Sequence, residues 1–295
     1  MNLYYQNLSL INSIHNHSLL INRIKQSPFN PNYVATCSWD RTVKIWNPQN
    51  WNLIRTFTGH ALFVLTVEFI NEDIIASGSY DGYILIWSIS SGNITMTIHT
   101  VYFVMALKMF NNEGSLAAGL GDKVINIYDI NTGALELTLI GHNAAINELV
   151  LVNENGNNLL ISSSVDQTIR IWDLNTNMTK LILNGHTQGV YGLKLLSSDT
   201  LSSGSIDGTV RIWNITSGKL IRILNDTNPV LWSVDLLTDE ILVSGSVSGT
   251  IKLWDWTSGE LLNEINNTGI ITWSMAVVRL KIITSKNLSF FYCFI

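Results

Sequence analysis

The chain has 295 residues, of which 46% are hydrophobic and 13% are charged, and its formal net charge at pH 7 is -5. A chain of this length and apolar content can bury a large core, so it needs neither disulfides nor a structural metal to fold. With 17 basic and 22 acidic residues and no run rich in Lys or Arg, nucleic acid and anionic membranes are disfavoured as partners. Cys37 and Cys293 form no ligand framework, and Cys37 lies in an apolar strand pattern where a buried free thiol is expected.

The N-terminal segment does not show the pattern of a secretory signal peptide. Residues 1–14 lack a basic region followed by a continuous apolar region, so no signal peptide is expected. The longest uncharged stretch, residues 88–107, is interrupted by polar residues and is not expected to span a membrane. We therefore expect a cytoplasmic protein, with the nucleus as an alternative.

An internal repeat with a period of roughly 41 residues runs along the chain. Each copy has an apolar segment that ends near an aromatic residue, namely Trp46, Trp87, Tyr128, Trp172, Trp213 and Trp254. The second copy is predicted to contain four short strands, here named a to d, at residues 64–69, 74–79, 83–87 and 94–98. Asp81-Gly82 and Ser91-Gly92 supply turns between b and c and between c and d.

Gly-His pairs before the repeats and Trp-Asp-like pairs at their ends resemble the WD-repeat family. The first kind of pair occurs as Gly59-His60, Gly141-His142, Gly185-His186 and the variant Asn16-His17. The resemblance covers nearly the whole chain and implies an all-β fold. It predicts a seven-bladed β-propeller of four-stranded antiparallel blades, as a single domain over residues 1–295.

A seventh, weaker unit follows Trp254. Residues 272–275 resemble strand a at residues 231–234, and residues 288–291 are predicted as strand c, ending near Phe291. No fourth strand follows them, whereas residues 8–14 precede Asn16-His17 as another strand d would. We therefore predict that this N-terminal strand completes the last blade and closes the ring, which also shields sheet edges.

Four blades contain a His, a Ser or Thr, an Asp and a Trp at matched spacing. These tetrads are His17/Thr36/Asp40/Trp46, His60/Ser77/Asp81/Trp87, His142/Ser162/Asp166/Trp172 and His186/Ser203/Asp207/Trp213. One set alone would resemble a hydrolase triad, but an active site needs a single set with its own oxyanion donors, so repetition indicates architecture. The resemblance implies a buried hydrogen-bond network from the Asp through the His and the hydroxyl to the indole N–H. Two blades depart from the pattern, with Thr100, Ala118 and Tyr128 in blade three and Thr227 and Ser248 in blade six.

The remaining polar residues give no enzyme signal. No glycine-rich phosphate loop, HExxH pair or carboxylate pair occurs outside the repeats, so no enzyme activity, cofactor or metal is expected. Basic residues two positions before the Trp alternate with apolar neighbours and are predicted to be solvated; they are Lys44, Arg170, Arg211 and Lys252.

By resemblance, partners are expected at the narrow end of the ring. The contacts would come from residues just before the turn Asp, here Trp39, Tyr80, Gly121, Val165, Ile206 and Val247. They would also come from residues flanking the start of strand a, here Phe63, Leu65, Phe103, Met105, Asn147, Tyr191, Trp232 and Trp273. These positions are rich in aromatic side chains and carry no Lys or Arg, which is typical of interface hot spots. The alternative is that several of these side chains fold inward and plug the channel or pack between blades.

The sequence therefore predicts a non-catalytic scaffold that binds a protein or peptide through apolar or aromatic anchor residues. Two alternatives remain. The first is a substrate receptor or sensor in a larger complex such as a ubiquitin ligase, although Trp172 and Trp254 lack the W-D-x-R ending that many receptors of the family carry. The second is a propeller hydrolase, which would need a unique polar cluster at the channel.

Overall fold

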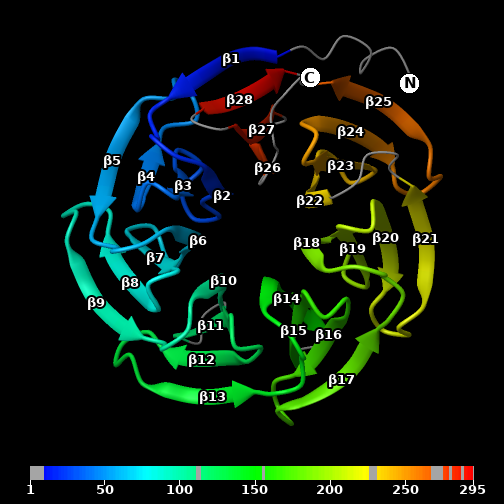
Figure 1. Cartoon of the computed structure of the whole chain (residues 1–295), viewed down its shortest axis with the longest axis horizontal. Coiled ribbons are helices and arrows are strands. Elements are labelled where there is room, and N and C mark those ends of the chain that lie inside the picture. The colour runs from blue at the N-terminus through cyan, green and yellow to red at the C-terminus, as the bar shows by residue number, and fades with distance from the viewer. Residues whose placement is uncertain are drawn as a thin grey trace.

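The chain folds into antiparallel sheets around a central axis. The computed structural model describes residues 10–110, 114–154, 157–225, 231–266, 275–278, 281–286 and 289–294. Within these ranges there are seven sheets of four strands and no helix. Each sheet has one strand beside the axis and one at the circumference, so the sheets form a ring (Figure 1). The predicted all-β propeller class is confirmed.

Six blades each consist of four consecutive strands. Blades one to three contain β2 (Ile21–Gln26), β3 (Val34–Ser38), β4 (Thr42–Trp46), β5 (Leu53–Thr58), β6 (Val64–Phe69), β7 (Ile74–Ser79), β8 (Tyr83–Ser88), β9 (Ile94–His99), β10 (Val104–Met109), β11 (Ser115–Leu120), β12 (Ile125–Asp129) and β13 (Leu135–Leu139). Blades four to six contain β14 (Ile146–Glu154), β15 (Asn157–Ser164), β16 (Ile169–Asp173), β17 (Met178–Leu183), β18 (Val190–Leu195), β19 (Thr200–Ser205), β20 (Thr209–Asn214), β21 (Leu220–Asn225), β22 (Leu231–Leu236), β23 (Ile241–Ser246), β24 (Thr250–Asp255) and β25 (Leu261–Asn266).

The seventh sheet joins both ends of the described chain. It contains β26 (Met275–Val278), β27 (Lys281–Lys286), β28 (Ser289–Phe294) and β1 (Leu10–His15), and β28 lies between β27 and β1. Strand β1 thus occupies the outer position for which residues 8–14 were predicted. The predicted end of β28 near Phe291 is wrong, because β28 pairs with β1 as far as Cys293 and with β27 as far as Phe294. The expected start of the innermost strand at residues 272–274 lies outside the described residues.

The b-to-c turns require a left-handed backbone at the residue after the Asp. Gly82 has a φ of 79° and Gly208 a φ of 80°, a region that glycine enters without a steric penalty. The same position holds Arg41 with a φ of 71° and Gln167 with a φ of 75°. The Asp-Gly turn expected at Asp81-Gly82 is therefore present, and its geometry is kept even where the glycine is missing.

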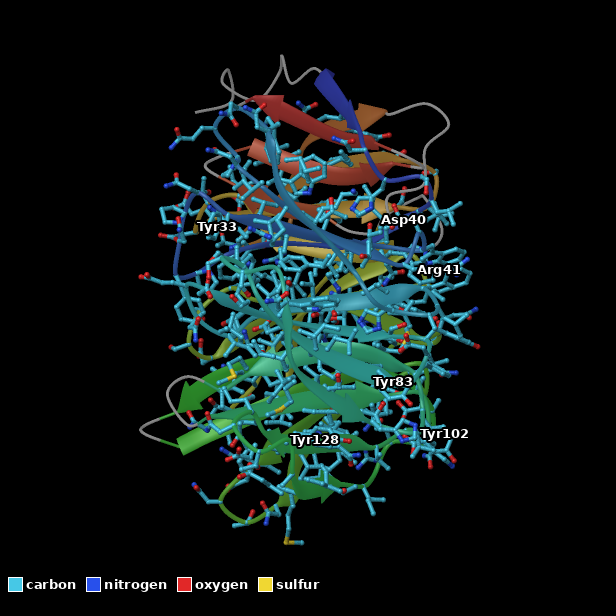
Figure 2. All side chains as sticks on the ribbon, turned by 90° about the vertical axis from the view of Figure 1, so that its left-hand side faces the viewer. Tyr33, Asp40, Arg41, Tyr83, Tyr102 and Tyr128 are labelled. Atoms are coloured by element: carbon cyan, nitrogen blue, oxygen red, sulfur yellow. The ribbon has the colours of Figure 1, made fainter. Side chains whose placement is uncertain are left out.

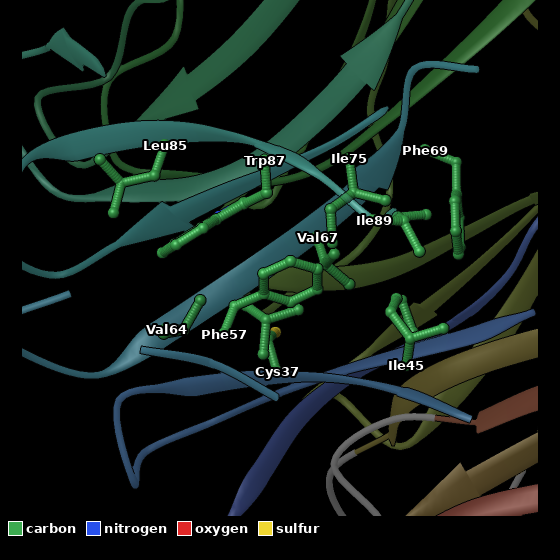
Figure 3. Packing of buried hydrophobic residues seen from close by; sticks show 12 residues of the cluster. Cys37, Ile45, Phe57, Val64, Val67, Phe69, Ile75, Leu85, Trp87 and Ile89 are labelled. Atoms are coloured by element: carbon green, nitrogen blue, oxygen red, sulfur yellow. The ribbon is translucent and has the colours of Figure 1, made fainter. Parts of the chain in front are cut away.

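The hydrophobic core lies between neighbouring blades. Figure 3 shows side chains of blade one, including Cys37 and Phe57, packed against Val67 and Trp87 of blade two. The ring centroids of Phe57 and Trp87 are 5.2 Å apart. Cys37 is a buried free thiol, as predicted, and burial raises its pKa to about 12. Each blade thus covers the apolar face of the next, which is how a propeller distributes one core around a ring.

The solvated position predicted for the basic residues before the Trp is wrong for two of them. Lys44 is 8% exposed and Lys252 is 2% exposed. Strand c lies inside its sheet, so the stems of these side chains are covered by their neighbours. The Lys252 ammonium lies 5.8 Å from the centroid of the Trp254 ring, and the Arg170 guanidinium lies 5.9 Å from that of Trp172, both in range of a cation–π contact.

A β-bulge follows the first residue of the innermost strand in each of blades one to six. A bulge leaves one residue out of the ladder and redirects its side chain. The six residues at this position are Asn22, Leu65, Met105, Asn147, Tyr191 and Trp232. The bulges therefore place six equivalent side chains around the axis.

Deleting residues 1–15 is expected to lower the melting temperature and promote aggregation. The deletion removes β1 and leaves β28 as an unpaired edge. Thermal melting and size-exclusion chromatography would measure both effects. Deleting residues 1–9, which keeps β1, is the matched control. A 1–15 deletion that melts like the full chain and stays monomeric would contradict the role given to β1.

Candidate functional site

The four tetrads form the same chain of hydrogen bonds. In blade one, His17 Nδ1 lies 2.7 Å from Asp40 Oδ2 and His17 Nε2 lies 2.8 Å from Thr36 Oγ1. The Trp46 indole N–H donates to Thr36 Oγ1 over 2.9 Å. Corresponding distances in the tetrads of His60, His142 and His186 lie between 2.7 and 3.0 Å.

The network favours a neutral imidazole. The Asp carboxylate accepts from Nδ1–H, so Nε2 accepts from the hydroxyl, whose oxygen in turn accepts from the indole. Burial lowers the pKa of His17 and His186, against the opposing effect of Asp40 and Asp207. Burial alone would raise the pKa of Asp40, but hydrogen bonds from His17, Thr42 and the backbone outweigh it, and the pKa of this carboxyl is lowered.

Each tetrad also ties two loops together. Asp40 Oδ2 accepts from the backbone N–H of Ser18, just after the His, and Asp40 Oδ1 accepts from that of Thr42, in the turn. The loop that leads into strand a is thereby fixed to the b-to-c turn. The four hydroxyl residues, Thr36, Ser77, Ser162 and Ser203, have no exposed surface. A nucleophile has to reach its substrate, so these hydroxyls are placed for structure.

Blades three and six lack the complete network. In blade three Thr100 Oγ1 lies 2.8 Å from the carbonyl oxygens of Gly82 and Tyr102, and its loop has no imidazole to place against Asp122. In blade six the Trp254 indole still donates to Ser244 Oγ over 2.9 Å. Ser248 replaces the Asp and bonds to the hydroxyl of Ser246 over 2.6 Å. Thr227 lies outside the described residues.

A cavity of about 390 Å³ lies at the axis, on the face that carries the b-to-c turns. Figure 2 shows Asp40 and Arg41 of one such turn toward the same face as Tyr102, with Tyr33 toward the opposite face. The cavity is lined by Asn22, Arg23, Trp39, Phe63, Leu65, Tyr80, Met105, Asn147, Tyr191, Trp232 and Ser233. We call it the mouth cavity. All six bulge residues belong to its lining.

Aromatic rings form two groups in the wall of the mouth cavity. Phe63 stacks on Trp39, with centroids 4.8 Å apart, and lies 6.5 Å from Tyr80. Tyr191 and Trp232 lie 4.2 Å apart at an angle of 59°. Tyr80 is 51% exposed and Phe63 is 37% exposed. These rings therefore combine mutual packing with an accessible face.

The other residues predicted for the narrow end lie outside this lining. Phe103 is half-buried and stacks on Tyr80 at 4.9 Å, beside Gly121. Val165 is 41% exposed, and Ile206 and Val247 are half-buried. Leu65, unlike these residues, belongs to the lining, and it is buried. Trp273 lies outside the described residues.

An ion pair crosses the axis beneath the aromatic rings. Arg23 Nη1 donates to Glu148, and Arg23 Nη2 donates to the backbone carbonyl of Asn147 over 3.3 Å. Arg23 comes from β2 and Glu148 from β14, which lie on opposite sides of the ring (Figure 1). Burial by itself lowers the pKa of Arg23, but the charge and hydrogen bond of Glu148 outweigh it, and this pKa is raised. Arg23 thus forms a charged floor beneath the mouth cavity.

Further charged residues line the channel, two positions after Arg23 and its equivalents in the innermost strands. Glu68 forms ion pairs with Lys25 and Lys108, and Lys194 forms one with Asp235. Burial alone would raise the pKa of Glu68, but the two ammonium groups outweigh it and lower this pKa. A second cavity of about 320 Å³ is lined in part by Lys25, Lys108 and Lys194. Because these cations are paired, the second cavity is not an open cationic site.

Three residues of the mouth cavity were not predicted from the sequence, namely Asn22, Arg23 and Ser233. They are polar residues of strand a, whereas the residues predicted for the narrow end are mostly apolar or aromatic. An alignment of strand a between blades puts Arg23 and Glu148, which have opposite charges, at the same position. Only the curvature of the ring shows that the two side chains meet across the axis.

Comparison with known proteins identifies the family. The family described as "WD domain, G-beta repeat" matches residues 8–47, 51–88, 133–173, 178–214 and 218–255. These segments cover more than half of the chain, and the chain belongs to this family. The unmatched residues 89–132 contain most of blade three, where the tetrad is missing. A WD-repeat propeller fits a protein-interaction scaffold.

Shorter similarities connect the chain to curated proteins. A 57-residue segment is 44% identical to Nuclear distribution protein PAC1 of Candida tropicalis and covers 19% of this chain and 11% of that protein. A 34-residue segment is 50% identical to WD repeat domain-containing protein 83 of Homo sapiens, covering 12% and 11%. A 65-residue segment is 38% identical to Polycomb group protein FIE1 of Oryza sativa subsp. japonica, covering 21% and 14%. The match therefore spans 14% or less of each relative's length, and none of the names states a reaction.

Neither a membrane-spanning helix nor a cluster of metal ligands occurs among the described residues. They contain no helix long and apolar enough to cross a membrane. In the same residues, no three His, Cys, Asp or Glu side chains are grouped so that they could hold a metal ion.

Breaking a tetrad is expected to destabilise the fold. Asp81→Ala leaves the buried His60 without its partner and should cost about 1–3 kcal/mol. Trp87→Ala opens a cavity and should cost roughly 3–5 kcal/mol. Asp122→Ala is the matched control, because Asp122 holds the same turn position without an imidazole partner, and we expect it to cost less. Denaturant unfolding would measure all three, and unchanged stability of Asp81→Ala would contradict the structural role.

Stability is expected to fall as the pH drops below about 6.5, the usual pKa of an unfolded histidine. The folded His17 and His186 have lowered pKa values, so the unfolded state binds more protons in this range and is favoured. The lowered pKa of Asp40 adds to the loss below about pH 4. Melting temperatures between pH 7.5 and 5 would show the first step. His186→Gln should flatten it and the exposed His99→Gln should not, whereas a melting temperature that rises toward pH 5 would contradict the expectation.

Proposed function

We propose that this chain is a non-catalytic scaffold that binds a peptide or protein segment at the mouth cavity, through an apolar or aromatic anchor residue. The observation that carries the proposal is the set of aromatic rings around one accessible cavity of about 390 Å³. This size lies in the range of small-ligand pockets, about 300–1,000 Å³. Large rigid side chains of this kind supply most of the binding energy in protein interfaces.

The polar groups of the site argue for binding and against catalysis. Among the described residues that line the mouth cavity, Arg23 is the only charged one, and it is paired with Glu148. The hydroxyl groups of the tetrads are fully buried and bonded to imidazole and indole nitrogens. The site therefore offers a partner shape and apolar surface, and it offers no free acid, base or nucleophile among the residues that line it.

Removing aromatic rings from the mouth cavity should weaken binding more than folding. A peptide-display library selected against the wild-type chain would supply ligands, whose affinities are then measured by fluorescence anisotropy. Tyr80→Ala and Trp232→Ala should each weaken binding by on the order of 2 kcal/mol. Because the half-exposed Tyr80 contributes little to the core, its variant should melt close to the wild-type temperature.

Tyr102→Ala is the matched control for Tyr80→Ala. Tyr102 is 49% exposed, against 51% for Tyr80, but it does not line the mouth cavity. It should leave affinity unchanged. Affinity should also vary little with salt, since few ion pairs would be screened. If Tyr80→Ala and Trp232→Ala both reduced the melting temperature and left peptide affinity intact, these residues would be packing residues and the site would lie elsewhere.

A further inference from the structure

Two asparagines at equivalent bulges of the mouth cavity differ in one hydrogen bond. Asn22 of blade one donates through Nδ2 to the carbonyl of Leu65 over 2.5 Å, and its Oδ1 accepts from the Trp39 indole over 3.3 Å. Asn147 of blade four likewise donates through Nδ2 to the carbonyl of Val190 over 2.8 Å. This donation identifies the remaining amide atom of Asn147 as the acceptor oxygen.

The acceptor of Asn147 has no partner among the described residues. The residue is 3% exposed, and no described residue donates to its Oδ1. In blade one the donor is Trp39, which precedes the turn Asp. The corresponding residue of blade four is Val165, whose side chain has no donor. An unsatisfied buried acceptor costs about 1–3 kcal/mol, so a ligand that supplies a donor here regains that free energy.

A donor without a partner belongs to the same cavity. Arg23 Nε is buried and has no acceptor among the described residues. Its guanidinium is held by Glu148 and by the backbone carbonyl of Asn147, so Nε keeps a fixed place next to residue 147. Both Arg23 and Asn147 line the mouth cavity. Among the described residues that line the cavity, Arg23 therefore holds an unused donor and Asn147 an unused acceptor, both of them buried in this structure.

We infer that the anchor residue of the bound segment is an unmodified tyrosine, an inference that rests on the proposed function. Its ring would lie between the aromatic walls, and its hydroxyl would accept from Arg23 Nε–H and donate to Asn147 Oδ1. A phenylalanine leaves both groups unsatisfied, and a tryptophan supplies a donor only. A phosphotyrosine brings two negative charges to a cation that Glu148 already neutralises.

Small amides test the inference on the full chain. The probes are the N-acetyl amides of tyrosine, phenylalanine, tryptophan and O-phosphotyrosine, and their dissociation constants are measured by ligand-observed NMR. The tyrosine amide should bind about tenfold tighter than the phenylalanine amide, since the hydroxyl satisfies two buried groups. It should also bind more tightly than the tryptophan and phosphotyrosine amides.

The two asparagines give a matched pair of variants. Asn147→Leu should reduce the ratio between tyrosine and phenylalanine amides to about one, because the acceptor is lost. Asn22→Leu should keep the ratio, since the acceptor that it removes is already occupied by Trp39. Arg23→Lys keeps the positive charge near Glu148 and removes Nε, so it should also reduce the ratio. It serves as the second variant if Asn147→Leu does not fold.

Each other outcome overturns the inference in a distinguishable way. Equal affinity of the tyrosine and phenylalanine amides, or tighter binding of the tryptophan or phosphotyrosine amide, removes the role of the hydroxyl and leaves the proposed aromatic site standing. If Asn147→Leu and Arg23→Lys both keep the affinity ratio between the tyrosine and phenylalanine amides, the tyrosine hydroxyl does not bind Asn147 Oδ1 and Arg23 Nε. If none of the amides binds but the affinity of the display peptides still depends on Tyr80, the tyrosine inference is wrong and the proposed function stands. If no display peptide depends on Tyr80, the proposed function fails as well.

Discussion

The hydrogen-bond chain from the indole N–H to the Asp carboxylate is the interaction on which the rest of the structure depends. In blade one it joins strand c, strand b, the loop before strand a and the b-to-c turn through Trp46, Thr36, His17 and Asp40. All members are buried or nearly so, and each hydrogen bond satisfies a group that would otherwise be costly to bury. Because both loops at the narrow end are fixed by the same carboxylate, the residues next to them also hold fixed positions.

The mouth cavity follows from that fixation and from the bulges. The b-to-c turns position Trp39 and Tyr80, and the bulge at the start of strand a positions the six residues nearest the axis. Below them Arg23 and Glu148 meet across the ring. A half-buried ion pair of this kind costs desolvation and adds little net stability, but it defines a floor of fixed geometry. The result is a cavity whose walls are apolar and whose floor is polar.

Blade three shows the structure of a blade that lacks this hydrogen-bond network. Its loop carries Thr100 instead of a His, and the next residue, Val101, has a φ of 70° and is 70% exposed. A β-branched residue rarely adopts this conformation. The neighbouring rings of Tyr80 and Phe103 stack on each other at the same side of the narrow end. Tyr80 is half-exposed and Phe103 is half-buried. The sector between blades two and three is therefore one part of the ring in which a loop is not fixed by a complete tetrad.

The sequence by itself determined the fold class and the residues of the tetrads, because a period of roughly 41 residues with matched Gly-His, Asp-Gly and Trp positions is a local pattern repeated many times. It also predicted the N-terminal strand in the last sheet, which β1 occupies. The tertiary structure alone decided which narrow-end residues share a cavity and that Lys44 and Lys252 are buried. It alone brought Arg23 to Glu148 and left Asn147 Oδ1 without a donor among the described residues. These features depend on contacts between blades far apart in the chain, and on bulges that change the direction of one side chain per strand, neither of which an alternating pattern records.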